Sequence, residues 1–196
     1  MYRDDHIRMG KDLCQKYLND VSYAGRFLFR LGNIVPDYLP PTYLKGITRD
    51  KKPLGHNYDN CRISVKLRIN WLNFKKHWGL FSYFALGVLM HYTADSFTYP
   101  HNNFFDGSLH DHAVYEQVLH QKLWKRNAVP VITTEMARTA KEDLFSFFER
   151  QHEEYAANRK EMSDDIAYIK RNCFLLMDLL CADHGHMPVR SLIMEW

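Results

Sequence analysis

A chain of 196 residues is long enough to bury one hydrophobic core without cross-links. Its net charge of +3 is too mild to indicate a nucleic-acid partner. Four cysteines, none in a Cys-x-x-Cys pair, argue against a thiolate zinc site and against a disulfide framework. We therefore expect a single domain over residues 1–196.

The lengths of the apolar runs test for a signal peptide and for a transmembrane helix. The N-terminal residues lack the apolar segment of a signal peptide, and the longest apolar run, around residues 80–90, is too short to span a bilayer. The sequence thus predicts a cytoplasmic protein with no transmembrane segment, and it leaves the oligomeric state open.

The chain begins with two predicted helices and a turn. Asp4 or Asp5 can cap a first helix that reaches about Leu18 and carries His6 in its first turn. A second helix over residues 23–31 should end at Gly32. A short apolar turn then carries Asp37 directly after a proline.

Residues 39–60 are predicted to form the longest loop, because prolines and glycines deny it regular structure. This loop contributes His56 as a candidate ligand. Residues 45–76 hold nine Lys or Arg against two Asp. That excess could draw in an anionic substrate or could simply be a solvated charged face, and both readings stay open.

Residues 62–71 alternate strictly between apolar and polar, which is the period of a half-buried strand. We nevertheless favour a helix here. No second alternating run is available to pair with it, and a lone strand leaves its backbone groups without partners.

Residues 80–97 are apolar on nearly all sides, as in a central buried helix. His91 and Asp95 are four residues apart and so share one helix face. Pro100 should stop the helix, which lets His101 turn toward the same region. An isolated His–Asp pair is more often a hydrogen-bonded pair inside a core than a metal site.

The next helix, capped by Ser108 or Asp111 and running to about residue 126, repeats the spacing with His112 and Glu116. Three histidines and two carboxylates within 26 residues form a set suited to zinc. His110 and His120 have no clear partner and are treated as non-ligands.

The C-terminal part reads as two more helices. A long amphipathic helix should start at Thr133 or Thr134 and run to about Asn158. Ser163 can cap a last helix, which faces a core.

Taken together, the candidate ligands resemble those of the zinc-dependent phospholipase C family, which is related in fold to the zinc nucleases specific for single strands. The resemblance is carried by His6, Pro36-Asp37, His56, His91-x-x-x-Asp95, His101 and His112-x-x-x-Glu116. It implies an all-α, single-domain bundle of about seven to ten helices, with a zinc cluster in a cleft.

Carried over residue by residue, the resemblance implies two to three zinc ions. One would be held by Asp37, His56 and His91, with Asp95 as a bridge. A second would be held by His101, His112 and Glu116, and a third by His6 and the Asp95 bridge. Asp37 would also be the general base that activates water.

The implied activity is hydrolysis of a phosphodiester by a phospholipase C-type enzyme, with phospholipid as one candidate substrate and no nucleic acid required as a partner. A zinc nuclease, a phosphomonoesterase and a non-catalytic, zinc-stabilised helical module remain alternatives. In one respect the sequence departs from secreted members, whose processed N-terminal residue completes the third zinc shell. Here Met1 lies five residues before His6 and no signal is visible.

Overall fold

The computed structural model describes residues 1–38, 57–125 and 132–186. All regular secondary structure in these residues is helical, which confirms the all-α prediction. The elements are α1 (Arg3–Tyr17), α2 (Tyr23–Gly32), η1 (Val35–Asp37), α4 (Tyr58–Phe74), α5 (Leu80–Ser96), η2 (Tyr99–His101), α6 (Leu109–Leu123), α7 (Thr134–Glu142), α8 (Leu144–Asn158) and α9 (Met162–Ala182).

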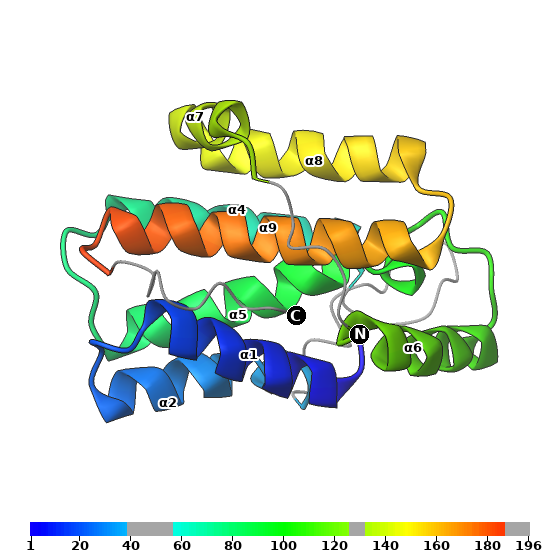
Figure 1. Cartoon of the computed structure of the whole chain (residues 1–196), viewed down its shortest axis with the longest axis horizontal. Helices are drawn as coiled ribbons and strands as arrows, with labels where there is room; N and C mark the ends of the chain where they lie inside the picture. The colour runs from blue at the N-terminus through cyan, green and yellow to red at the C-terminus, as the bar shows by residue number, and fades with distance from the viewer. Residues whose placement is uncertain (39–56, 126–131, 187–196) are drawn as a thin grey trace.

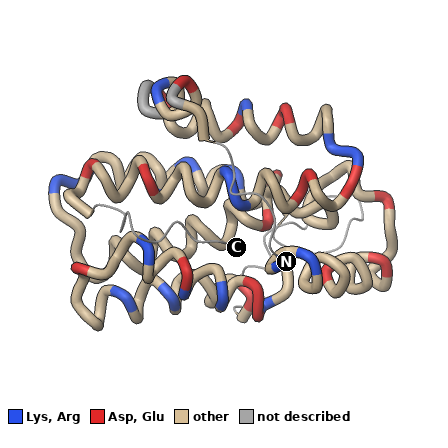
Figure 2. Tube along the Cα trace, viewed as in Figure 1, with Lys and Arg blue, Asp and Glu red and all other residues tan. Residues whose placement is uncertain are grey.

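The central helix is α5, and the other elements are arranged around it (Figure 1). It packs against α2 on one side and against α4 and α9 on the other, while α7 and α8 form an outer layer. Acidic and basic residues are interspersed along most helices (Figure 2). None of the described helices combines the length and hydropathy needed to span a bilayer.

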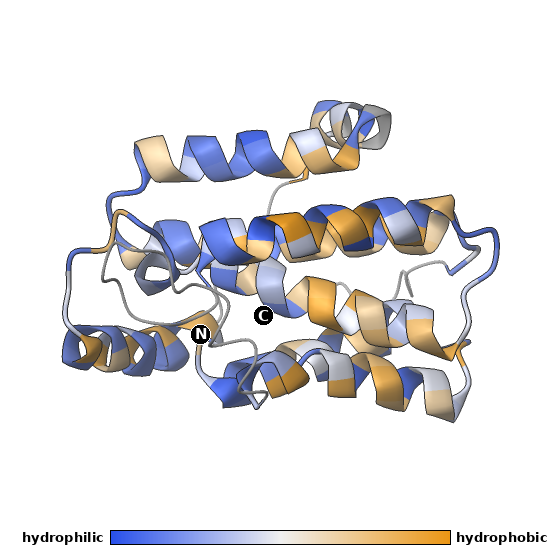
Figure 3. Cartoon of the chain, turned by 180° about the vertical axis from the view of Figure 1, so that it is seen from behind, coloured by the Kyte–Doolittle hydropathy of each residue, from blue (hydrophilic) through white to orange (hydrophobic). Residues whose placement is uncertain are grey.

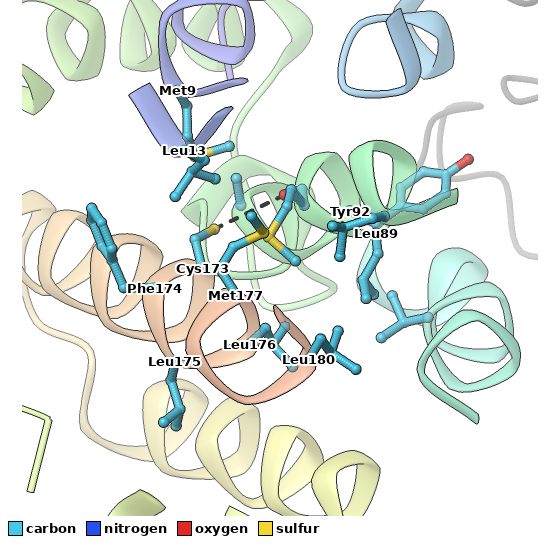
Figure 4. Packing of buried hydrophobic residues seen from close by; sticks show 14 of the residues in the cluster. Met9, Leu13, Leu89, Tyr92, Cys173, Phe174, Leu175, Leu176, Met177 and Leu180 are labelled. Carbon is cyan, nitrogen blue, oxygen red and sulfur yellow. Dashed lines mark hydrogen bonds between the residues drawn. The ribbon is translucent and has the colours of Figure 1, made fainter. Parts of the chain in front are cut away.

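The core lies between α5 and its neighbours, as the sequence predicted for residues 80–97. From Leu86 to Ser96 every residue of α5 is buried. Met177 and Leu180 of α9 are packed against this layer, and the thiol of Cys173 points to the Met90 carbonyl (Figure 4). Hydrophobic segments accordingly concentrate in the central helices, and α6 and α8 are more hydrophilic (Figure 3).

Two glycines allow α2 and α5 to approach closely. A Cβ added at Gly87 would lie 2.0 Å from the Phe29 carbonyl oxygen, and one added at Gly32 would lie 2.1 Å from the Phe84 carbonyl oxygen. Both distances are far below van der Waals contact. The helix ends at Gly32, as the sequence predicted, and the same glycine allows this close packing.

Residues 62–71, which alternate between apolar and polar like a strand, are helical, as we favoured, and belong to α4. The geometry of this helix explains the alternation. Residues two apart on a helix are separated by about 200° and so point to opposite sides. One apolar set, Cys61, Val65, Ile69 and Leu72, is buried against the core. The other set, Ile63, Leu67, Trp71 and Phe74, is exposed. The period of two therefore reflects a helix with two apolar faces.

The largest departure from the predicted elements is in residues 133–158. The expected single helix is divided into α7 and α8 at Asp143. The Asp143 carboxylate accepts a hydrogen bond from the Ser146 amide at 3.0 Å, so it caps α8 as a new helix. Smaller shifts occur elsewhere, since α4 begins at Tyr58, inside the predicted loop.

We expect Gly87→Ala to lower the free energy of unfolding by about 1–3 kcal/mol, because the added methyl group forces α2 and α5 apart. Gly79→Ala is the matched control, since a Cβ there meets no atom within 4 Å. Its cost should stay below about 1 kcal/mol, the scale of a changed helix N-cap. Chemical denaturation of both variants measures the difference, and equal costs would contradict the close-packing argument.

Candidate metal centre

The first group of candidate ligands joins α1 to α5. His91 and Asp95 occupy successive turns of α5, and the ring of His6 comes from the first turns of α1. The three side chains are at most 1% exposed. His6 and His91 lie with their rings stacked, at a centroid distance of 3.8 Å. Residues far apart in sequence thus meet at one buried point.

Asp95 faces the two imidazoles with different oxygens. Its Oδ1 lies 3.1 Å from His6 Nε2, and its Oδ2 lies 3.1 Å from His91 Nε2. A carboxylate that bridges two cations presents one oxygen to each. The geometry is therefore compatible with the bridging role that the family resemblance implies for Asp95.

Asn33 fixes the orientation of this group. Its carbonyl oxygen accepts a hydrogen bond from His91 Nδ1 at 3.0 Å, which directs His91 Nε2 toward Asp95. Its side-chain amide donates to the carbonyl oxygen of His6 at 2.5 Å. One buried residue after α2 therefore ties α1 to α5 and sets which ring nitrogen of His91 faces the centre.

Asp37 approaches the same group from η1. Its Oδ1 lies 3.5 Å from His91 Nε2, and its side chain is 18% exposed, in contrast to the enclosed Asp95. Pro36, which precedes it, is buried and fixes the turn. The carboxylate of Asp37 is thus placed beside the buried ligands with access to solvent.

The second group combines η2 with α6. Glu116 Oε1 lies 3.1 Å from Nε2 of His101 and 3.1 Å from Nε2 of His112. These side chains are partly exposed, by 11%, 29% and 17% for His101, His112 and Glu116. Ser108 is the N-cap of α6, one of the two residues predicted for this role, and Asp111 completes a capping box with it. This cap sets the helix start from which His112 and Glu116 project.

The two groups adjoin each other. His101 Nδ1 lies 3.8 Å from Asp95 Oδ2. The N-terminal ammonium of Met1 lies between the groups, 3.0 Å from Asp95 Oδ1, 2.6 Å from Glu116 Oε1 and 2.8 Å from His101 Nε2. Atoms of both groups thus surround the Met1 ammonium, which joins the two groups electrostatically.

The electrostatics keep the acids charged and one imidazole neutral. Burial, reinforced by the neighbouring His91, lowers the pKa of His6 to about 4. Burial alone would raise the pKa of Glu116, but the Met1 ammonium and the two histidines reverse this and hold it well below its usual range. Neutral imidazole and ionised carboxylate are the forms that bind zinc.

Both groups fit zinc in donor type and spacing. In each group, one ligand atom per residue can be chosen so that all lie within 4.8 Å of one another. Ligands on bonds of about 2.0–2.2 Å in a tetrahedral shell lie roughly 3.3–3.6 Å apart, close to the separations seen here. Each group thus offers three of the four ligands of a tetrahedral zinc shell.

Seven of the eight residues predicted as metal ligands are brought together: His6, Asp37, His91, Asp95, His101, His112 and Glu116. The eighth, His56, lies outside the described residues. Of the two histidines treated as non-ligands, His120 contacts Asp5 at 2.8 Å instead.

Comparison with known proteins identifies the family. The sequence model for zinc-dependent phospholipase C matches residues 6–162, most of the chain. The chain belongs to the zinc-dependent phospholipase C family. Its members are hydrolases, and zinc dependence follows from that membership. Searches of curated proteins and of solved structures returned no match.

Sequence reasoning missed a buried carboxylate that supports the second group. Asp165, at the start of α9, is fully buried and accepts hydrogen bonds from the Tyr99 amide at 2.8 Å, Tyr115 Oη at 2.7 Å and Tyr155 Oη at 3.0 Å. Arg159 Nε donates to it at 3.0 Å. Tyr99 begins η2 and Tyr115 precedes Glu116, so Asp165 joins the two elements that carry the second group.

We expect Asp165→Asn to reduce zinc content by about one ion per chain, with His101 and Glu116 losing their fixed spacing. Asp178→Asn is the control, because Asp178 is a partly buried carboxylate of the same helix α9 that lies beside Tyr17, away from the second group. Elemental analysis of both folded variants measures the effect. Full zinc in the Asp165 variant would show that the hydrogen bonds of Asp165 to η2 and α6 have no role in metal binding.

Proposed function

We propose that the protein is a zinc-dependent phosphodiesterase of phospholipase C type, active at the combined site of the two ligand groups. The observation that carries this proposal is the position of Asp37, a partly exposed carboxylate 3.5 Å from His91 and beside an already buried ligand group. A purely structural zinc site is closed by four ligands. Two adjoining ligand groups and an additional partly exposed acid are more than a structural zinc site requires, so we infer a catalytic site.

Each part of the site has a role in this proposal. Zinc held by these residues would polarise a phosphoryl oxygen and bring the pKa of a water molecule toward neutrality. His91, oriented by Asn33, and the bridging Asp95 would fix the buried side of the site. Asp37 would take the proton from the attacking water. The more exposed His112 and Glu116 would border the side from which a phosphoester enters.

The direct test is turnover of the purified, zinc-loaded protein on a panel of substrates. A phospholipase C-type enzyme cleaves the phosphodiester on the glycerol side of a phospholipid headgroup. Cleavage of single-stranded nucleic acid or of phosphomonoesters would instead favour the nuclease or the phosphomonoesterase. Zinc binding without turnover on any member of the panel would favour the non-catalytic module.

We expect the protein as purified to hold at least two zinc ions, and its melting temperature to fall by several degrees or more when they are removed. The reason is that Asp95 and Glu116 then lose the cations that balance their charge. Elemental analysis, followed by thermal scans before and after chelation and after zinc is restored, measures this. A single ion, or an unchanged melting temperature after demonstrated metal loss, would contradict it.

We expect Asp37→Asn to lower hydrolysis by roughly 10²- to 10⁴-fold, the scale of a lost general base, because the amide cannot accept the proton. Its zinc content should be largely kept. Glu116→Gln is the comparison: it removes a ligand charge, so it should cost zinc first and activity as a consequence. Zinc content and kcat are measured for both. Full activity with full metal in the Asp37 variant would remove it as the base.

A further inference from the structure

The outer face of α4 is an exposed apolar stripe. Its side chains are Ile63, Leu67, Trp71 and Phe74, with exposed fractions of 70%, 63%, 37% and 89%. They follow the 3.6-residue period of one helix face, opposite the buried face of the same helix. Single exposed apolar residues are ordinary, but a continuous stripe on one helix marks a contact surface.

Two more exposed apolar side chains follow α4 in the sequence. Leu80 and Phe81, the first residues of α5, are 46% and 81% exposed. Five residues, 75–79, separate them from the stripe. The end of α4 and the start of α5 therefore both expose large apolar side chains.

Basic residues accompany the stripe. Residues 57–79 contain five Lys or Arg and one acid, Asp59. Arg62 forms an ion pair with Glu149 of α8, and counting both acids still leaves an excess of three positive charges. Lys66 and Lys76 are exposed. The Lys75 ammonium lies 4.4 Å over the ring of Trp71, at the edge of the stripe.

This composition favours a lipid surface over a protein partner. Lysine is depleted in the centre of protein–protein interfaces. Helices that lie on membranes combine an apolar face with Lys and Arg, and each basic residue near an anionic surface adds to binding. Lysine can extend its ammonium to the headgroups while its stem and an aromatic ring stay in the apolar layer. Lys75 and Trp71, which lie side by side at the edge of the stripe, are residues of the types that this arrangement uses.

We propose that the outer face of α4 docks the protein on an anionic phospholipid surface. This proposal rests on the phospholipase C-type function, because docking on a bilayer would bring such an enzyme to a phospholipid substrate. The start of α4 lies near the metal centre: Cys61 Sγ is 3.7 Å from Ser96 Oγ, next to Asp95. A membrane in contact with α4 is thereby brought close to the site.

Binding of the full chain to vesicles tests the docking face without any need for activity. Phosphatidylcholine vesicles with and without phosphatidylglycerol are sedimented with the protein at low and high salt. The double variant Leu67→Ser/Phe74→Ser removes two apolar side chains of the stripe. Phe27→Ser is the matched control, because Phe27 is 54% exposed on α2.

We expect the wild type to bind the anionic vesicles, more weakly at high salt, and the double variant to bind at least about tenfold more weakly. Phe27→Ser should bind like the wild type. Equal binding by the wild type and the double variant, an equal loss in the control, or no vesicle binding by the wild type would overturn the proposal. So would a dimer in light scattering that the double variant converts to a monomer, since a second copy would then cover the stripe.

Turnover of a short-chain, monomeric phosphodiester separates this proposal from the function itself. The double variant should cleave it at the wild-type rate while losing activity on vesicles. Absence of any turnover with vesicle binding intact would refute the enzyme function and leave the docking face standing. Wild-type rates on both substrates in the double variant would refute the docking face alone.

Discussion

The carboxylate of Asp95 is the constraint on which the rest of the structure depends. Placing a charged group at 1% exposure in the most apolar helix is costly unless positive charge or metal surrounds it. Side chains and the backbone amine from three other elements meet this need, since His6, His101 and the Met1 ammonium converge on it with His91. The N-terminal segment, α1 and η2 therefore all pack toward one residue of α5.

Buried hydrogen bonds around Asp95 hold the candidate ligands in position. Asn33 orients His91 from one side through its carbonyl group. Asp165 holds η2 and α6 from the other side, with Arg159 as its counter-charge. Both supports use buried groups that are hydrogen-bonded, which is what keeps ligands at the spacing that metal binding requires. The site is enclosed around Asp95 and more open toward His112.

Local spacing explains which parts could be predicted from sequence. His91 with Asp95, and His112 with Glu116, are four residues apart on helices, so their shared faces follow from helix geometry. The caps at Ser108 and Thr133 follow from side-chain chemistry in the same way. The roles of Asn33 and Asp165 could not be predicted, because their contacts join residues far apart in the chain and Asn33 orients His91 through its backbone carbonyl. The two apolar faces of α4 were visible as alternation, but only the structure shows which face is buried.

The distance in sequence between His6 and Asp95 has a consequence for how the protein reaches its native state. Their contact spans 89 residues of the chain, so it is a long-range closure that exists only when α1 is docked against α5. The first ligand group is therefore complete only in the docked state. An ion bound there would link the first helix to α5. Transient undocking of α1, without global unfolding, is then the route by which the buried ion can exchange with solution.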